Sequence, residues 1–203
     1  MLAAIKHGLS NLTNFQGRDA RQAFWFYVLF LYLITIGMGM AVSIPMSMEA
    51  VMTGVQQGIA NAQAGNTDPA VSEAAAQAAI ASSMRGYMPV MVWVSFASAA
   101  ILLLGLAAAI VRRLHDSGLA GQWALLPLGL QAINAAFIPT QLGRLEEMLA
   151  AQFTDPFAAF KVYDGVLGLG AVAGWIAIIL VIIFGVRKST PGPNQYGEAP
   201  FIA

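Results

Sequence analysis

A charged turn, Val111-Arg112-Arg113-Leu114-His115-Asp116-Ser117-Gly118, separates two long apolar segments of this chain. Outward from the turn, four apolar runs cover residues 24–44, 88–111, 123–139 and 165–186, and none contains a charged side chain. A helix rises about 1.5 Å per residue, so about 20 apolar residues cross a hydrocarbon core about 30 Å thick. Three runs reach that length, and 123–139 is at the lower limit. We therefore predict an all-α fold, a four-span transmembrane helical bundle that forms one membrane domain over residues 1–203.

The composition agrees with membrane segments. Apolar residues make up 58% of the 203 residues and charged residues only 10%, whereas a soluble domain carries about 25% charged residues. The formal net charge is zero, which gives no overall basic signal for nucleic acid. The chain has no cysteine, which excludes disulfides, thiolate metal sites and cysteine nucleophiles. We predict no metal, no cofactor and no nucleic-acid partner.

The charges are sorted between the two sides of the predicted bundle. Segments 1–23, 112–122 and 187–203 would share one side, and they hold seven Lys or Arg against three Asp or Glu. Segments 45–87 and 140–164 would share the other side, with three basic against seven acidic residues. Lys and Arg near the ends of spans are retained in the cytoplasm. Both termini, including the tail 187–203, and the turn at Arg112 are therefore predicted to be cytoplasmic.

The two outer segments differ in character. In 45–87, apolar residues recur every four positions over 51–59, and an Ala-rich stretch covers 70–81. Asp68 is suited to cap a helix that starts at Pro69. Two readings stay open for this segment: a solvated pair of short helices, or a mobile low-complexity loop.

Interfacial amphipathic helices are expected at both membrane surfaces. In 140–164, apolar residues recur at spacings of three and four, a pattern typical of a helix lying in the headgroup zone. They are Leu142, Leu145, Leu149, Phe153, Phe157 and Phe160. A weaker stripe near the N-terminus consists of Leu2, Ile5, Leu9 and Leu12.

Two pairs of arginines lie at span ends on the predicted cytoplasmic side. Arg18 and Arg21 are three residues apart and so share one face of a helix, while Arg112 and Arg113 close the second run. Ordinary topology anchoring explains such residues. The sharper hypothesis is that the two pairs together grip a lipid phosphate, because guanidinium forks match phosphate oxygens.

His115 beside Asp116 raises the question of acid-base chemistry. Adjacent residues cannot usually orient one another as a catalytic triad requires, and no nucleophile with a clear role is nearby. A structural turn, in which Asp116 pairs with a nearby arginine, is the favoured reading. We therefore predict that the protein is not an enzyme.

The tail from Arg187 to Pro200 is rich in turn-forming residues and alone is typical of a disordered end. Asn194 and Tyr196 are unlike a plain charged tail, and we predict that they fold back on the arginines. In a bundle, the ends of neighbouring spans lie about 10 Å apart. Four guanidinium groups so close need countercharge beyond Asp19 and Asp116, from lipid phosphate, tail carbonyls, Glu198 or an acidic partner.

Three motifs, taken in order, resemble a known family. They are Phe15-x-Gly17-Arg18-x-x-Arg21-x-x-Phe24-Trp25, Arg113-Leu114-His115-Asp116-x-Gly118-x-x-Gly121-x-Trp123 and Gly192-x-Asn194-x-Tyr196-Gly197-x-x-Pro200. Together they look like the bacterial inner-membrane family called domain of unknown function 805, from about Phe15 to Pro200. The chain departs from the family at Ala120 and Gln122. The resemblance implies a multi-pass protein of the bacterial inner (plasma) membrane, and it implies no activity, substrate or cofactor.

Polar residues inside the predicted spans are few. Gln131 and Asn134 lie three apart in the third run and are expected to join helices by hydrogen bonds, with a polar pore wall as the alternative. Gly170 and Gly174 form a small-xxx-small face suited to close helix contact within or between chains. No ionisable residue lies inside the spans, which disfavours coupled transport.

These observations lead to one functional expectation and one alternative. We expect a non-enzymatic scaffold or accessory subunit, whose partner is an anionic lipid headgroup or a membrane protein. The candidate binding residues are Arg18, Arg21, Arg112, Arg113, His115, Asp116, Asn194 and Tyr196. The alternative is a small transporter or permeation unit, built as a homo-oligomer through Gly170 and Gly174.

Overall fold

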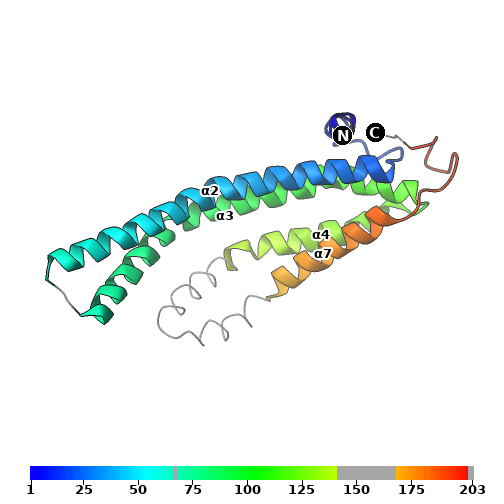
Figure 1. Cartoon of the computed structure of the whole chain (residues 1–203). Helices are drawn as coiled ribbons and strands as arrows, with labels where there is room; N and C mark the ends of the chain where they lie inside the picture. The colour runs from blue at the N-terminus through cyan, green and yellow to red at the C-terminus, as the bar shows by residue number, and fades with distance from the viewer. Residues whose placement is uncertain (66–67, 141–167, 201–203) are drawn as a thin grey trace. The chain divides into compact units, whose positions relative to one another are not determined.

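The computed structural model describes residues 1–65, 68–140 and 168–200, and these form helices and no strand. Figure 1 shows the element order: α1 (Leu2–Ser10), α2 (Arg21–Gln63), α3 (Pro69–Asp116), a 3-10 turn η1 (Gly121–Ala124), α4 (Leu125–Ala136) and α7 (Leu169–Val186). The predicted all-α class is confirmed for this part of the chain.

Three of these helices, α2, α3 and α7, are long and apolar enough to cross a membrane. They cover the first, second and fourth predicted runs. The third run is different, because its start is taken up by η1 and α4 has only 12 residues before a turn at Phe137. That is shorter than the roughly 20 residues a span needs. The fourth crossing therefore stays a prediction.

Two interpretations were left open for 45–87, a pair of short helices or a mobile loop, and the described residues of this segment favour the helical pair. The two helices are not short separate ones, because they are the ends of α2 and α3, which continue through Pro45 and Pro89 without a break. A proline removes one backbone hydrogen bond and tends to kink a helix, and long apolar helices tolerate that. The predicted cap is confirmed: the Ala70 amide donates to Asp68 Oδ1 at 3.0 Å. The stripe from Leu142 to Phe160 lies outside the described residues.

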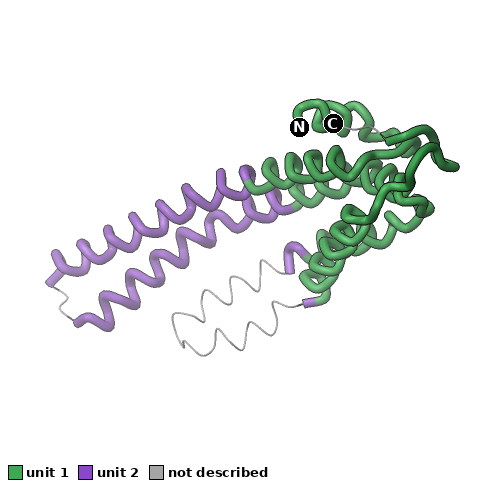
Figure 2. The backbone as a smooth tube through the Cα atoms, turned by 45° about the vertical axis from the view of Figure 1, so that its right-hand side comes forward, with its two compact units in different colours: residues 1–36, 96–137, 169–203 green, residues 37–95, 138–168 purple. Residues whose placement is uncertain are grey.

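The chain divides into two compact units, coloured separately in Figure 2. One is built from residues 37–95 and 138–168, and in it the outer ends of α2 and α3 pair. Asn61 Nδ2 there donates to Ser72 Oγ at 3.3 Å, and the Tyr87 hydroxyl donates to Glu49. The other unit is built from residues 1–36, 96–137 and 169–203, and it holds both chain termini and every candidate site residue.

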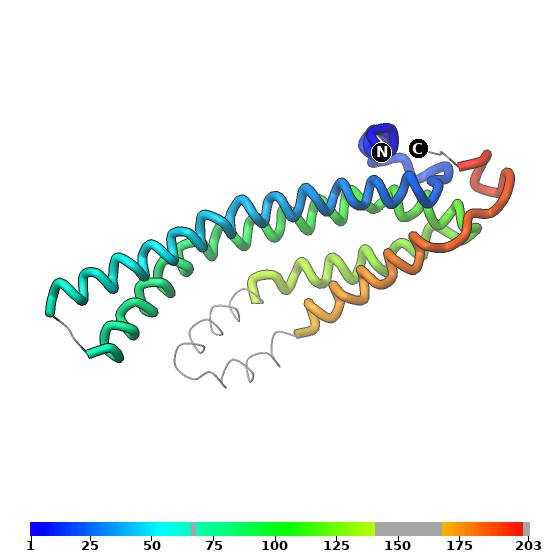
Figure 3. The backbone as a smooth tube through the Cα atoms, viewed as in Figure 1, coloured from blue at the N-terminus to red at the C-terminus, as the bar shows by residue number. Residues whose placement is uncertain are grey.

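Within this second unit, the start of α2, the end of α3 and the end of α7 share one core, and α4 packs along α7 (Figure 3). Phe24 and Tyr27 of α2 pack with Ile110 and Leu114 of α3. Helix α7 comes close to α2 at Gly185, where a Cβ atom would lie 2.6 Å from the Trp25 ring. This close approach brings the ends of three helices together at one edge of the core.

Candidate functional site

The strongest feature at that edge is a group of buried charges, which we call the polar cap: Arg18, Asp19, Arg112, Arg113, His115, Asp116 and the tail 187–198. Arg18 Nη2 donates to Asp116 Oδ1 at 3.1 Å, across 98 residues of sequence. The same guanidinium donates to the carbonyl oxygens of Thr190 and Gly192, each at 2.6 Å. Arg18 thus joins the entry to α2, the end of α3 and the tail.

Arg113 makes a second set of bonds around the same carboxylate. Its Nη1 donates to Asp116 Oδ2, and its Nε donates to the Gly185 carbonyl at 3.1 Å. Its Nη2 donates to the Arg187 carbonyl. Arg113 and Asp116 are both 0% exposed. Burial lowers the pKa of Arg113 and the nearby Asp116 carboxylate raises it, so the ion pair offsets part of the cost of burial.

A second ion pair holds α1 in place. Arg112 Nε donates to Asp19 Oδ2 at 2.9 Å, and Arg112 Nη1 donates to the carbonyls of Asn11 at 2.7 Å and Asn14 at 2.6 Å. His7, on α1, lies 2.9 Å from the other Asp19 oxygen. The segment after α1 is therefore tied to the end of α3 by one arginine.

The tail packs on the end of α3 through side chains as well as through carbonyls. The rings of His115 and Tyr196 stack with centroids 4.0 Å apart, and Asn194 Nδ2 donates to the His115 carbonyl at 2.9 Å. Burial lowers the pKa of His115, which lies beyond the predicted span, and the Gly17 carbonyl opposes that shift. This lowered pKa favours the neutral form of the ring that stacks on Tyr196.

The turn after α3 exposes the carbonyl that the tail uses. Gly118 has a φ of +77°, the left-handed conformation that commonly ends a helix. With the chain turned there, the Asp116 carbonyl accepts from the Thr190 amide at 2.8 Å and from the Thr190 hydroxyl at 3.0 Å. The tail is therefore held by backbone bonds as well as by arginines.

The predicted convergence of the three motifs is confirmed. Three buried guanidinium groups (Arg18, Arg112 and Arg113) face two buried carboxylates, Asp19 and Asp116. Carbonyl oxygens of the tail, of Gly185 and of residues 11–14 accept further donors. The predicted contribution of tail carbonyls is therefore confirmed, and lipid phosphate and an acidic partner stay predictions. The fold-back of Asn194 and Tyr196 is confirmed too.

Not every predicted site residue enters this buried group. Arg21 is exposed, although its Nη2 donates to the Arg187 carbonyl at 3.2 Å. Conversely, the sequence reading missed His7 and Thr190. The one available signal for His7 is that Asn11 lies four residues later on the same helix face. A lone threonine in a turn-rich tail gives no signal for Thr190.

The hydrogen-bond partners and burial of Asp116 are unfavourable for an acid-base reaction at His115 and Asp116. The Asp116 carboxylate is engaged by Arg18, Arg113 and the Ser189 hydroxyl, while the His115 ring contacts Gly17 and Tyr196. General acid-base catalysis needs a group within reach of a substrate proton. A carboxylate with no exposed surface has no such reach.

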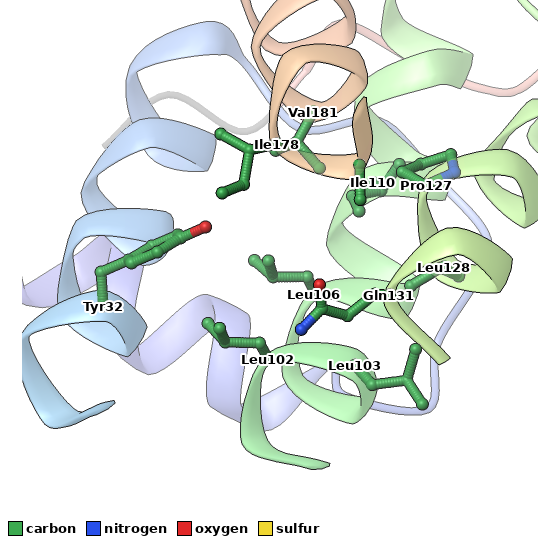
Figure 4. A pocket seen from close by; sticks show the side chains of 11 residues that line it. Tyr32, Leu102, Leu103, Leu106, Ile110, Pro127, Leu128, Gln131, Ile178 and Val181 are labelled. Carbon is green, nitrogen blue, oxygen red and sulfur yellow. The ribbon is translucent and has the colours of Figure 1, made fainter. Parts of the chain in front are cut away.

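A small cavity lies inside the bundle, between α2, α3, α4 and α7. Figure 4 shows the Tyr32 hydroxyl and the Gln131 amide pointing toward each other across it. Its volume is about 30 Å³, enough for one or two water molecules, each of which needs about 10–15 Å³. Gln131 therefore lines a mostly apolar pocket, and this pocket is far too small for a solute path.

Asn134 and Gly174 account for the contact between α4 and α7. A Cβ atom at Gly174 would lie 3.0 Å from the Asn134 side chain, so the small-residue face is filled within the chain. Gly170 is also buried. A homo-oligomer through Gly170 and Gly174 stays an untested prediction, and this packing does not support it.

Comparison with known proteins gives one match. The family model described as "Protein of unknown function (DUF805)" matches residues 12–198. That range contains the first two sequence motifs, the third motif up to Gly197, and the whole polar cap. No curated protein and no solved structure matches the chain.

Proposed function

We propose that this chain, which belongs to the DUF805 family, is a four-span protein of the bacterial inner membrane with both termini in the cytoplasm. We further propose that it acts without catalysis, as a scaffold or accessory subunit that presents the folded polar cap to a partner protein. The observation that carries the proposal is the use of the buried arginines. The three buried arginines donate hydrogen bonds to carboxylates and carbonyls of the same chain; they are Arg18, Arg112 and Arg113. Such a cluster builds a rigid surface and leaves no free guanidinium fork inside it.

This use of the arginines bears on the choice among functions. A phosphate bound inside the cap would have to displace several charge-assisted hydrogen bonds, which are roughly twice as strong as neutral ones. A scaffold needs only that the cap keep its shape. The transporter alternative would need chains to pack through Gly170 and Gly174, and the face at Gly174 is filled by Asn134 of the same chain. We therefore prefer the scaffold.

The proposed topology can be tested by thiol labelling, because the natural chain has no cysteine. Ala64→Cys and Gln122→Cys place single thiols at exposed positions near the end of α2 and in the turn after α3. An impermeant maleimide added to cells with a permeabilised outer membrane should label position 64 and spare position 122. Lysed cells should label at both positions, which controls for reactivity. Labelling of 122 alone in unlysed cells would invert the orientation.

The proposed role can be tested by native mass spectrometry of the protein extracted gently from its own membrane. A scaffold or accessory subunit predicts a complex whose mass includes a second, different protein in fixed ratio. Whole multiples of the chain mass in a closed ring would instead support the transporter alternative. A free monomer as the sole species, with the cap intact, would contradict a role that depends on a partner protein.

A further inference from the structure

An apolar groove runs between α2 and α7. Its walls are residues of α2 from Trp25 to Tyr32 and residues of α7 from Ile178 to Ile182, and its volume is about 310 Å³. Both walls belong to predicted spans, so under the proposed topology the groove opens to the acyl chains of the bilayer. A groove lined by Leu29, Val181 and Ile182 suits a hydrocarbon chain.

Trp25 lines the end of the groove nearest Arg21, where it packs close to Gly185 of α7. A Cβ atom at Gly185 would lie 2.6 Å from the Trp25 ring, so the two helices touch there. One helical turn beyond Trp25, the exposed Arg21 donates through Nη2 to the Arg187 carbonyl at 3.2 Å. Arg187 and Lys188 are also exposed, and they directly follow the end of α7 at Val186. Three cations therefore lie where α2 begins and α7 ends.

These exposed cations differ from the buried ones in their partners. Each buried arginine of the polar cap has a carboxylate, either Asp19 or Asp116. Among the residues that the structure describes, no carboxylate forms an ion pair with Arg21, Arg187 or Lys188. Asp19 and Asp116 are buried and already form ion pairs with the buried arginines. The side chain of Glu198 is exposed in the tail. These three cations are thus available to an anion from outside the fold.

We propose that this groove binds one anionic glycerophospholipid, with an acyl chain along α2 and α7 and its phosphate at Arg21, Arg187 and Lys188. The proposal rests on the membrane placement proposed above. Guanidinium groups match phosphate oxygens, and tryptophan favours the level of the headgroups, where Trp25 lies in the predicted topology. A free phosphate would satisfy the cations and leave the groove unused, so an amphiphile fits both parts of the site.

The test uses the full-length chain in mild detergent, with native mass spectrometry during titration of phosphatidylglycerol or phosphatidylcholine. We expect one phosphatidylglycerol to be retained at least tenfold more strongly than phosphatidylcholine, since each cation near an anionic headgroup contributes roughly fivefold. Replacing Arg21, Arg187 and Lys188 together by Gln should abolish this preference. Lys6→Gln, which removes an exposed cation on α1 away from the groove, is the matched control and should bind as the natural chain does.

Two further arms separate a lipid site from a phosphate site. Leu29→Trp, which fills the groove from an exposed position, should weaken retention of phosphatidylglycerol while leaving the three cations in place. Millimolar inorganic phosphate should not compete. Full competition by phosphate, or equal retention of both lipids by the natural chain, would overturn the proposal. If either result occurs while thiol labelling of positions 64 and 122 is as expected, only the lipid site is contradicted. An altered labelling pattern would contradict the proposed membrane topology.

Discussion

Asp116→Asn is expected to cost about 3–5 kcal/mol of folding free energy, because it strands two buried guanidinium groups that share this carboxylate. Arg18 loses its one ion-pair partner, at 3.1 Å, and Arg113 loses its partner one helical turn away. The change keeps the shape of the side chain and removes only its charge. We expect a clear drop in protein abundance in the membrane and a much lower melting temperature of the purified protein by fluorescence-detected size-exclusion chromatography.

The matched control is Glu198→Gln, which makes the same change of charge at an exposed side chain of the tail. An exposed charge contributes at most about 1 kcal/mol, so this variant should melt close to the natural protein. If both variants melt together, the buried charges of the polar cap do not stabilise the fold. Such an outcome would also remove the rigid surface on which the scaffold proposal depends.

The sequence predicted the convergence of the polar cap better than it predicted the helices outside it. Basic residues at three span ends on one side must lie near each other in a bundle, and the buried residues Arg18, Arg112 and Arg113 obey that rule. The hydrogen-bond partners of each arginine could not be predicted. Whether an arginine meets a carboxylate or a carbonyl depends on a few ångströms of helix offset, which side-chain periodicity does not encode.

The ends of the helices were also only partly predictable from the sequence. Pro45 does not end α2, although proline disfavours a helix interior, and α2 continues to Gln63. Asp68 does cap α3, because a side-chain oxygen near a free backbone amide is a local signal. The third run is apolar over 17 residues, yet α4 occupies only 12 of them. Apolarity indicates where a segment can lie, and turns such as η1 decide how much of it is helical.

The second large effect concerns the tail. If residues 187–198 are held in the polar cap, Gly118→Cys and Thr190→Cys should form a disulfide within one chain. A Cβ atom at Gly118 would lie 3.4 Å from Thr190 Cγ2, so the two side chains are in van der Waals contact, as the short span of a disulfide requires. The left-handed φ of +77° at Gly118 adds some strain to a cysteine there. The nearby bond from the Thr190 amide to the Asp116 carbonyl, at 2.8 Å, keeps the two positions together.

This cross-link tests the central claim, that the tail is an integral part of the polar cap, most directly. Membranes that carry the double variant are treated briefly with a mild oxidant, alkylated, and analysed by mass spectrometry. The single variants control for disulfides between chains, and the same protein unfolded in detergent controls for chance encounters along the chain. We predict nearly complete loss of both alkylation sites in the folded protein and slow, partial loss in the unfolded one. Full alkylation of both thiols in folded membranes would contradict the claim.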